Sequence, residues 1–320
     1  MKKIAILTSG GDAPGMNPAI RAAVKQGLNA GLSIVGIKKG YEGLFSKEFT
    51  SLNSKDVSGI INYGGTILRT ARCEEMMQPE GVKKAFEIIK DLGIEGLIVI
   101  GGDGSLTGAK KLSDYGLPVI GIPGTIDLDL DCTEYTIGFD TAVNTAVDAI
   151  GRIRDTSSSH DRCSVIEVMG RNCGYLAVWS AITSGACAAL VPEVPEIGID
   201  NVIERIIKNR LKGKTHNIVV VAEGVGNSYD LTKQIETKTG IESRSTVLGH
   251  LQRGGPPTVL DRKHATAMGS LAVEALLSGN ANKITILKNG KYELIDIEEG
   301  LNYKREFDRK LFDMVSCLSL

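Results

Sequence analysis

The sequence lacks the features that mark membrane proteins, secreted proteins and nucleic-acid-binding proteins. No apolar run approaches the roughly 18 residues that a membrane-spanning helix requires, so we expect no membrane contact. The formal net charge is -1, and therefore no overall basic field favours nucleic acid. The N-terminal apolar run covers only about four residues before glycines follow, which favours a first β-strand over a signal peptide.

The six cysteines show neither a C-x-x-C pair nor the spacing of a zinc site. They are Cys73, Cys132, Cys163, Cys173, Cys187 and Cys317. We expect reduced thiols in a cytoplasmic protein, most of them buried as small hydrophobic side chains. The four histidines are scattered along the chain, which gives a histidine-based metal site little support.

Motifs of several nucleotide-binding and hydrolase families are also missing. The closest match to a Walker A motif ends at Gly213-Lys214-Thr215, but Lys208 stands where its first glycine belongs. No G-x-G-x-x-G fingerprint opens the first expected helix. Neither a G-x-S-x-G elbow nor a protein-kinase signature is present.

Glycine is abundant, with 38 residues, and its placement is informative. Short apolar runs at residues 4–7, 97–100 and 118–122 each lead into a glycine-containing segment. Such continuously apolar runs are typical of parallel strands that are buried on both faces. Further strands are expected at Cys163–Val168 and at residues 218–222.

Helical patterns alternate with these strands, which predicts an α/β fold with mostly parallel sheets. The expected helices cover residues 17–30, 81–92, 105–113, 140–154, 174–185, 200–211 and 258–278. A second βαβ-rich region begins near residue 139, and 320 residues suffice for two lobes. The helix at 258–278 and a hairpin across Asn289-Gly290 indicate a return to the first lobe. Ligands of such folds bind at loops beyond the carboxyl ends of the strands.

Three of these strand ends carry candidate functional residues. The segment from Gly101 to Ser105 is either a phosphate-binding loop with Asp103 as a magnesium ligand, or a tight turn with Asp103 as a helix cap. The segment at residues 8–17 repeats this pattern. After the third strand, Asp127 and Asp129 could serve as a general base and a metal ligand, or could be ordinary acidic loop residues.

Five arginines lie beside Gly, Ser, Cys or His rather than in solvated charge runs. They are Arg72, Arg162, Arg171, Arg244 and Arg253. Arginine binds phosphate through two parallel hydrogen bonds and can neutralise charge in a transition state. Taken singly, each of them could equally be a surface ion pair.

Seven motifs occur in an order and spacing that resemble one family along the whole chain. They are TSGGDAPGMN (8–17), IGGDGS (100–105), PGTID (123–127), RDTSSSH (154–160), EVMGR (167–171), the region of Glu223, and VLGHLQRGG (247–255). Together they resemble the bacterial ATP-dependent 6-phosphofructokinases.

The resemblance implies a cytoplasmic homotetramer with shared active sites and two Rossmann-like, three-layer α/β/α lobes. An ATP-binding lobe would comprise residues 1–138 plus about 251–301, and a sugar-phosphate lobe residues 139–250 plus about 302–320. The implied reaction moves a phosphoryl group from Mg-ATP to the 1-hydroxyl of fructose 6-phosphate, which gives fructose 1,6-bisphosphate and ADP.

Residue roles carry over from the family by position. The implied catalytic residues are Gly11, Arg72, Thr125, Asp127 and Arg171, with Asp127 as the base for the sugar hydroxyl. The residues implied to contact ATP are Gly11, Tyr41, Arg72, Cys73, Gly102, Asp103, Gly104 and Ser105. Asp103 and Asp129 would bind Mg²⁺.

The sugar phosphate is implied to bind a third set of residues. These are Thr125, Ile126, Asp127, Arg162, Met169, Gly170, Arg171, Glu223, Arg244, His250, Leu251, Gln252 and Arg253. His250 and Arg253 would hold the 6-phosphate, while Arg162 and Arg244 would reach it from a neighbouring subunit.

The implied effector site binds a nucleotide diphosphate or phosphoenolpyruvate. Its residues would be Arg21, Lys25, Arg154, Gly185, Cys187, Lys212, Lys214, Thr215 and His216. The family usually has Arg at Lys25, Glu at Cys187 and an aromatic residue at Lys55, so we expect altered allosteric control. Leu128 stands where Asn is usual between the two aspartates, and Cys73 replaces an aromatic residue.

Three alternatives compete with this hypothesis. Pyrophosphate-using relatives carry Asp at Gly104 and Lys at Gly124, whereas glycine at both positions favours ATP. A degenerate regulatory homologue would account for Leu128 and Cys187, but Asp103 and Asp127 are intact. A lipid or NAD kinase that shares only the GGDG turn would leave the other motifs unexplained.

Overall fold

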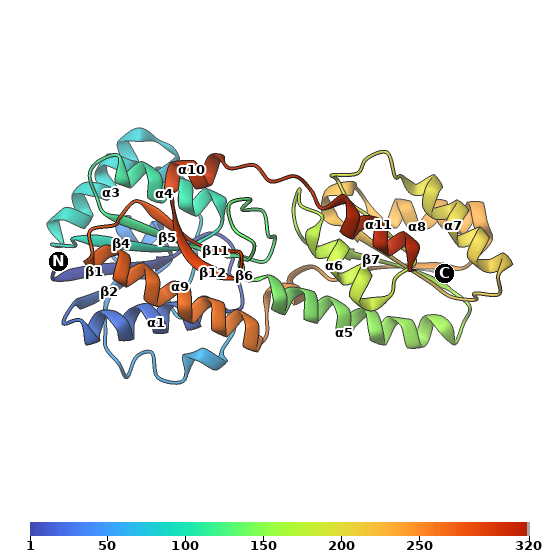
Figure 1. The fold of residues 1–320 in the computed structure, drawn as a ribbon, viewed down its shortest axis with the longest axis horizontal. Helices are drawn as coiled ribbons and strands as arrows, with labels where there is room; N and C mark the ends of the chain where they lie inside the picture. Colours follow the sequence, from blue (N-terminus) through green and yellow to red (C-terminus); the bar gives the residue numbers. More distant parts are fainter. Residues whose placement is uncertain (319–320) are drawn as a thin grey trace. The chain divides into compact units, whose positions relative to one another are not determined.

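The computed structural model describes residues 1–318 as two compact units (Figure 1). Unit 1 comprises Met1–Ile126, Leu130–Thr141 and Arg253–Arg305. Unit 2 comprises Asp127–Asp129, Ala142–Gln252 and the chain from Glu306 onward. The predicted catalytic segment is therefore divided in the chain, because Ile126 ends a part of unit 1 and Asp127 begins a part of unit 2.

Unit 1 is built on one mixed sheet whose strand order is β12-β11-β5-β4-β1-β2-β3, with β6 beside β5. Its strands are β1 (Lys3–Thr8), β2 (Ser33–Ile37), β3 (Phe49–Leu52), β4 (Gly96–Gly101), β5 (Val119–Thr125), β6 (Ile137–Gly138), β11 (Lys283–Lys288) and β12 (Lys291–Asp296). Strands β2, β1, β4, β5 and β11 run parallel, whereas β3 and β12 are antiparallel to their neighbours. The carboxyl ends of β1, β4 and β5 consequently meet at one edge of the sheet.

Helices cover both faces of this sheet, with α1 and α9 on one side and α3 and α4 on the other (Figure 1). The helices of unit 1 are α1 (Met16–Asn29), α2 (Glu42–Phe45), α3 (Pro79–Asp91), α4 (Asp103–Ser113), α9 (Val259–Leu277) and α10 (Ile297–Asn302). Ile89 of α3 and Leu106 of α4 pack with Leu97 and Val99 of β4 in one apolar core. This packing fixes the start of α4 directly after the end of β4.

Unit 2 contains a fully parallel sheet in the order β10-β7-β9-β8. Its elements are β7 (Cys163–Val168), α6 (Tyr175–Ser184), β8 (Ala188–Leu190), α7 (Ile199–Leu211), β9 (Asn217–Ala222), α8 (Ser228–Thr239), β10 (Ser243–Val247) and α11 (Arg309–Cys317). Ile206 of α7 and Ile235 of α8 share a core with Val219 and Val221 of β9. The long helix α5 (Phe139–Ser158) begins in unit 1 and continues into unit 2.

The predicted α/β class with mostly parallel sheets is confirmed, and most predicted elements lie within two residues of their observed bounds. The hairpin across Asn289-Gly290 joins β11 to β12, with φ of 50° and 73° at the two turn residues. Four helices, α2, α8, α10 and α11, and five short strands, β2, β3, β6, β8 and β10, were not predicted. Among the helices of the described residues, none is both long and apolar enough to cross a membrane.

Candidate active site

The two glycine-rich segments that follow β1 and β4 lie side by side in unit 1. The backbone N–H of Ser9 donates to the carbonyl oxygen of Ile100 over 3.0 Å. A Cβ atom on Gly101 would come within 2.5 Å of the Ser9 carbonyl oxygen and 2.6 Å of Ser105 Oγ. Only glycine fits there, so the close approach of the two loops explains this residue.

The first turn of α4 begins with two exposed residues. Asp103 and Gly104 are exposed, and a Cβ atom on Gly104 would meet no atom within 4 Å. The first N–H groups of a helix have no partner within the helix and carry the positive end of its dipole. This turn can therefore bind a phosphate group, as the sequence indicated.

Tyr41, which the sequence implied as an ATP contact, is buried beneath this turn. Its hydroxyl group donates a hydrogen bond of 2.6 Å to the carbonyl oxygen of Ser105. A Cβ atom on Gly108 would come within 2.9 Å of the Tyr41 ring. Burial raises the pKa of the Tyr41 hydroxyl, and the nearby Cys73 thiol adds to the effect. The side chain thus supports the loop from the core side.

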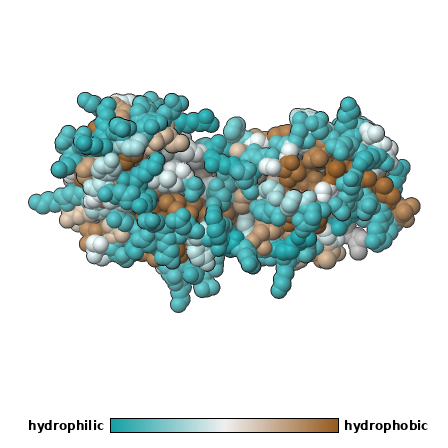
Figure 2. Space-filling view, turned by 90° about the horizontal axis from the view of Figure 1, so that it is seen from above, coloured by the Kyte–Doolittle hydropathy of each residue, from teal (hydrophilic) through white to brown (hydrophobic). Residues whose placement is uncertain are grey.

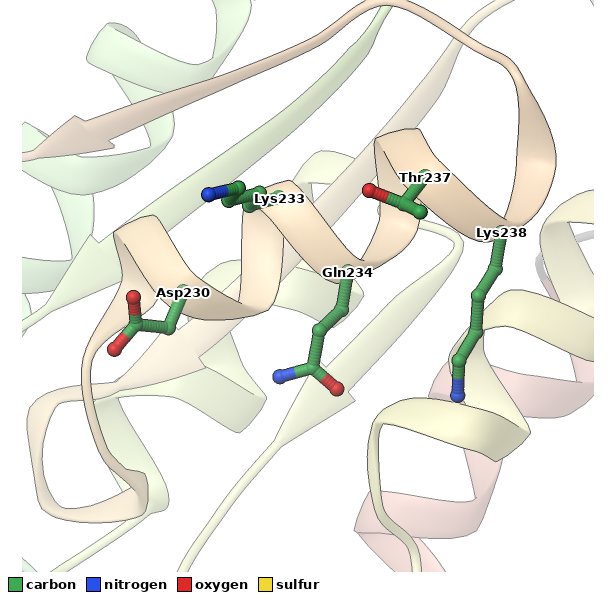
Figure 3. Close-up of a pocket in the computed structure, with 5 residues that line it drawn as sticks. All are labelled: Asp230, Lys233, Gln234, Thr237 and Lys238. Atoms are coloured by element: carbon green, nitrogen blue, oxygen red, sulfur yellow. The ribbon is translucent and has the colours of Figure 1, made fainter.

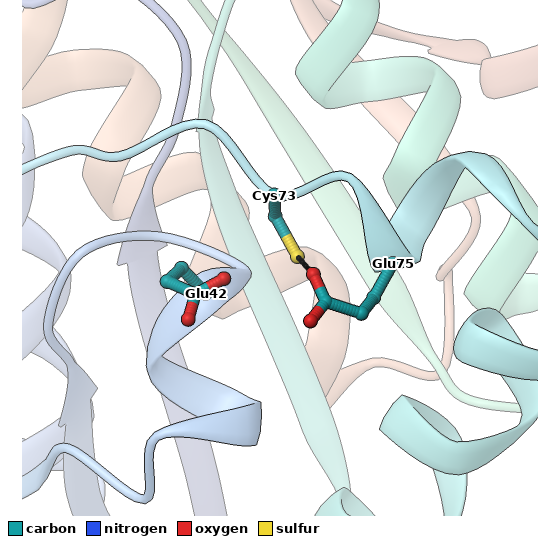
Figure 4. Close-up of side chains that lie close together, drawn as sticks. All are labelled: Glu42, Cys73 and Glu75. Carbon is teal, nitrogen blue, oxygen red and sulfur yellow. Dashed lines mark hydrogen bonds between the residues drawn. The ribbon is translucent and has the colours of Figure 1, made fainter.

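Cys73 lies in a small cluster with Glu42 and Glu75 (Figure 4). The ligand atoms of the three side chains lie within 4.8 Å of one another, and the thiol is 3.7 Å from Glu75 Oε2. Burial, followed by the two carboxylates, raises the pKa of Cys73 to about 11. The residue after the exposed Arg72 therefore carries a neutral thiol.

Arg253 lies against the first glycine-rich loop within unit 1. Its guanidinium group occupies the space that a side chain on Gly11 would need. Nη2 lies 3.4 Å from Asp12 Oδ1, and Nε donates to the Asp12 carbonyl oxygen over 3.3 Å. Two residues predicted for different phosphates are thus neighbours, and a side chain at position 11 would displace the Arg253 guanidinium group.

The residues just before Arg253 belong to unit 2 and differ strongly in exposure. His250 and Leu251 are exposed, whereas Gln252 is fully buried. The Gln252 amide nitrogen donates to the Gly249 carbonyl oxygen over 3.2 Å. Gln252 thus has a structural role within the turn. The sequence implied only a contact between Gln252 and the sugar phosphate.

The predicted catalytic segment follows β5. Thr125 ends the strand, and a Cβ atom on Gly102 would lie 3.5 Å from Thr125 Cβ. Asp127 is largely buried and forms an ion pair with Arg171, with 3.5 Å between Oδ2 and Nε. The structure therefore joins the proposed base to one of the predicted arginines within unit 2.

A second turn in unit 2 brings three further predicted residues together. Gly170 has φ of 131°, and a side chain there would overlap the carbonyl oxygen of Cys173. The Arg171 backbone N–H donates to Glu223 Oε1 over 2.7 Å. The sequence predicted Met169, Gly170, Arg171 and Glu223 as one subsite, and these contacts show that they are close in space.

Arg162 and Arg244 share one carboxylate that the sequence analysis missed. Glu242 Oε2 lies 2.9 Å from Arg162 Nε, and Glu242 Oε1 lies 2.6 Å from Arg244 Nη2. The hydrogen bond from Arg162 is the main cause of a lowered pKa at Glu242. The sequence could have indicated this contact, because Glu242 stands two residues before Arg244. Glu242 directly precedes β10, which pairs with β7.

The predicted effector residues are split between the two units. Arg21 and Lys25 lie on α1 of unit 1. In unit 2, Arg154 donates to the carbonyl oxygen of Ser184, and Arg154 and Lys214 both contribute to a lowered pKa at His216, after burial. Gly185, Lys212 and Thr215 belong to unit 2 as well.

Cys187 lies in the apolar core of unit 2 rather than on its surface. Burial raises the pKa of its thiol to about 11, against the opposing effects of Lys214 and Arg205. A carboxylate buried at this position would lose its hydration. It would therefore need an ion pair with Lys214 or Arg205 to be stable. Cys187 thus contributes an uncharged side chain to the core of unit 2.

A shallow pocket of about 360 Å³ lies along α8, lined by Asp230, Lys233, Gln234, Thr237 and Lys238 (Figure 3). Lys238 reaches to Asp200 of α7, with 2.5 Å between Nζ and Oδ1. None of the predicted site residues lines this pocket.

Comparison with known proteins shows which family the chain resembles. The family model for phosphofructokinase matches residues 3–276. ATP-dependent 6-phosphofructokinase 1 of Clostridium perfringens is 54% identical, and ATP-dependent 6-phosphofructokinase of Clostridium botulinum is 53% identical; each aligns over 319 residues that cover 100% of both chains. The crystal structure of Pichia pastoris phosphofructokinase in the T-state matches with a TM-score of 0.89 and 35% identity, and the match covers 94% of this chain and 35% of that chain. The chain therefore belongs to the phosphofructokinase family.

Proposed function

We propose that this protein transfers the γ-phosphoryl group of ATP to the 1-hydroxyl of fructose 6-phosphate, which yields fructose 1,6-bisphosphate and ADP. The observation that supports this proposal most directly is the position of the segment from Thr125 to Asp129. It begins beside the exposed first turn of α4 and places Asp127 in an ion pair with Arg171. Full-length relatives that are more than half identical and named for this activity support the same reaction.

The two units supply different parts of this reaction. The α4 turn and Gly11 of unit 1 would bind the ATP phosphates through backbone N–H groups, and the exposed Arg72 would neutralise the transferring group. The residues of unit 2 at Met169–Arg171 and Glu223 would hold the sugar. Unit 1 is thus proposed as the ATP-binding part and unit 2 as the sugar-phosphate part.

The chemical step needs a base and a stabilised anion. Asp127 would accept the proton of the sugar 1-hydroxyl as that oxygen bonds to the γ-phosphorus and the bond to the ADP oxygen breaks. The Arg171 guanidinium beside it would hold the carboxylate and balance negative charge. Thr125, two residues earlier in the chain, would lie near the transferring group.

The donor set fits magnesium. Asp103 is exposed at the helix start and Asp129 is a carboxylate in the catalytic segment, and Mg²⁺ prefers such oxygen ligands together with phosphates and water. When bound, the ion would neutralise the phosphate charge. Asp103 and Asp129 would orient it.

The choice of ATP over pyrophosphate rests on Gly104. A Cβ atom there would point into open space, so an acidic side chain at this position would extend beside the phosphate-binding turn. At Gly124, by contrast, a Cβ atom would meet Ile100 and Met16 at 3.1 and 3.2 Å. Packing in the core explains glycine at position 124, and the argument about the donor depends on position 104.

A coupled assay tests both the reaction and its donor. Fructose 6-phosphate is offered with either Mg-ATP or Mg-pyrophosphate at matched concentrations, and formation of fructose 1,6-bisphosphate is measured. We expect turnover with ATP to exceed turnover with pyrophosphate. Faster turnover with pyrophosphate would overturn the donor assignment, and no turnover with either donor would overturn the reaction.

A homotetramer with shared active sites forms part of the proposal. Arg162 and Arg244 would bind the 6-phosphate of a neighbouring subunit, and His250 and Arg253 would bind it from the subunit's own chain. Apolar side chains gather on the visible face of unit 2, at the right of Figure 2. Leu211 and Leu251 of this unit are 84% and 70% exposed. Exposed apolar surface of this kind is typical of subunit contacts.

Regulation and location complete the proposal. The basic residues Arg154 and Lys214 would bind an anionic effector, ADP or phosphoenolpyruvate, while the buried Cys187 would alter the response relative to proteins with Glu. All six cysteines are free thiols, which supports a reducing, cytoplasmic setting.

A further inference from the structure

Leu128 has an unusual backbone conformation between the two aspartates. Its φ is 54°, in the left-handed region that a branched side chain rarely adopts, and its side chain is buried. Arg171, which pairs with Asp127, has φ of 54° as well. Such conformations persist where surrounding contacts hold them. The contacts that hold Leu128 therefore bear directly on the position of Asp127.

One contact to the Leu128 backbone comes from Cys173. Its thiol donates to the carbonyl oxygen of Leu128, with 3.8 Å between sulfur and oxygen. Cys173 belongs to the same turn as Arg171, because its backbone N–H donates to the Gly170 carbonyl oxygen over 2.8 Å. The turn thus contacts the catalytic segment twice, once through the Arg171 side chain and once through the Cys173 thiol.

The thiol is fixed in its donor form by its surroundings. Burial, followed by the negative charges of Glu193, Asp129 and Asp127, raises the pKa of Cys173 to about 12. The sulfur therefore carries its proton throughout the neutral range. A thiolate would repel the carboxylates and could not donate to a carbonyl oxygen.

We propose that Cys173 is a positioning residue for the catalytic base. Its thiol holds the carbonyl of Leu128, and this contact fixes the left-handed peptide that follows Asp127. The orientation of the Asp127 carboxylate relative to the sugar hydroxyl then depends on Cys173, although Cys173 itself touches no reacting atom. The inference rests on the proposed function, in which Asp127 is the base.

Three variants test this role. Cys173→Ala removes the donor, Cys173→Ser keeps a donor of similar size, and Cys163→Ala is the matched control because Cys163 is a buried thiol of β7 in the same unit. If the alanine variant at position 173 does not fold, Cys173→Val fills the space of the thiol without a donor. The assays are kcat, KM for fructose 6-phosphate, the pH dependence of kcat, and thermal unfolding.

We expect Cys173→Ala to lower kcat about tenfold, since small misplacements of a catalytic group are costly, while KM changes less than about twofold. The acidic limb of the pH profile should shift, because that limb reports the base. Cys173→Ser should recover most of kcat, and Cys163→Ala should lose only thermal stability.

Wild-type kcat and an unchanged pH profile in Cys173→Ala would overturn the positioning role, whatever the loss of stability. Loss of activity in Cys173→Ser equal to that in Cys173→Ala would also overturn it. A wild-type protein without ATP-dependent turnover would instead refute the proposed function and, with it, this inference.

Discussion

At the scale of single residues, the predicted base has the contacts that its role requires. Asp127 is largely buried, directly follows the end of a part of unit 1 in the chain, and pairs with Arg171. Asp127→Asn keeps the shape of the side chain and removes its capacity to accept a proton. We expect kcat to fall more than about a hundredfold, with little change in KM for either substrate.

The control for this variant is Asp12→Asn. Asp12 has a half-exposed carboxylate that pairs with Arg253, so the exchange also removes one negative charge beside an arginine. Steady-state kinetics on both variants separate a general loss of charge from loss of the base. Turnover near the wild-type value in Asp127→Asn would contradict the assignment.

Glu242 supplies a second prediction at this scale. It neutralises Arg162 and Arg244, which we propose as ligands of the 6-phosphate. Glu242→Gln keeps hydrogen-bond acceptance at one oxygen but removes the charge that competes with a phosphate. We expect KM for fructose 6-phosphate to fall a few-fold, roughly the scale of one weakened charge contact, while KM for ATP stays constant. A rise in the KM for fructose 6-phosphate would show that Glu242 instead organises the two arginines.

Sequence patterns brought out candidate site residues more clearly than the surroundings of those residues. The motif around Asp127 and the turn at Gly170-Arg171 were recognisable because glycine and charged residues stand at strand ends. The burial of Tyr41 was not recognisable, because tyrosine occurs both at surfaces and in cores. Which of these a residue occupies depends on packing partners that are distant in sequence.

At the scale of helices and strands, the start of α9 is tied to the start of α5 by a buried carboxylate. Asp261 Oδ1 accepts hydrogen bonds of 2.6 Å from the Tyr135 hydroxyl and from the Gly138 N–H. Oδ2 accepts from the N–H and the hydroxyl of Thr141 over 2.9 and 2.5 Å. One side chain therefore fixes the segment that leads into the long helix α5.

We expect Asp261→Asn to lower the free energy of unfolding by about 2–4 kcal/mol, because the amide nitrogen would face donors that it cannot pair. Asp296→Asn is the control: Asp296 caps α10, and Asn caps helices as well as Asp. Chemical denaturation of both variants measures the difference. Equal stability of the two would show that the Asp261 contacts are not needed.

The same carboxyl predicts how stability depends on pH. Burial is the largest influence and raises the pKa of Asp261 above its usual 3.8, against the effect of its hydrogen bonds. Its contribution to stability is therefore greatest below the unfolded pKa and declines as pH rises through the raised folded pKa. We therefore compare the free energies of unfolding of the wild type and Asp261→Asn across this acidic range. The difference between the two free energies should become smaller as pH rises.

Strong apolar patterns predicted most helices and strands, whereas weak patterns were missed. Helix α8 has the sequence SYDLTKQIETKT, in which only Ile235 and two small polar residues are buried. Its start is set by the Asn227 side chain, which accepts from the Tyr229 N–H over 2.9 Å. A polar helix of this kind depends on its cap and on packing against β7 and β10, and neither has a clear signal in apolar spacing.

At the scale of the whole molecule, the predicted site residues are divided between the two units. The chain crosses between the units at Ile126-Asp127, Asp129-Leu130, Thr141-Ala142, Gln252-Arg253 and Arg305-Glu306. Several of these crossings lie within the predicted catalytic or phosphate-binding segments. The predicted site residues are therefore contributed by both units of the chain.

The proposed tetramer makes a prediction of its own. If Arg162 serves the site of a neighbouring subunit, Arg162→Ser and Asp127→Asn damage different contributors to each site. Hybrid tetramers form when the two variants are mixed in equal amounts and exchange subunits. Such a tetramer should contain an intact site wherever a subunit with normal Asp127 adjoins a subunit with normal Arg162. About one quarter of sites would satisfy this condition under random assembly of symmetric subunits.

We therefore expect mixing and subunit exchange to restore activity well above that of either variant alone. The control pair is Asp127→Asn with Arg171→Ser, because these two side chains form an ion pair within one unit of one chain. Every subunit in that mixture carries a damaged catalytic pair, so activity should not recover. The measurement is coupled-assay activity before and after exchange, with the oligomeric state followed by light scattering. Recovery only in the mixture of Arg162→Ser with Asp127→Asn would support a site shared between chains. In that mixture, each site takes its Asp127 and its Arg162 from different subunits. A monomer that keeps full activity at assay concentration would contradict the shared site, and so would equal recovery, or none, in both exchanged mixtures.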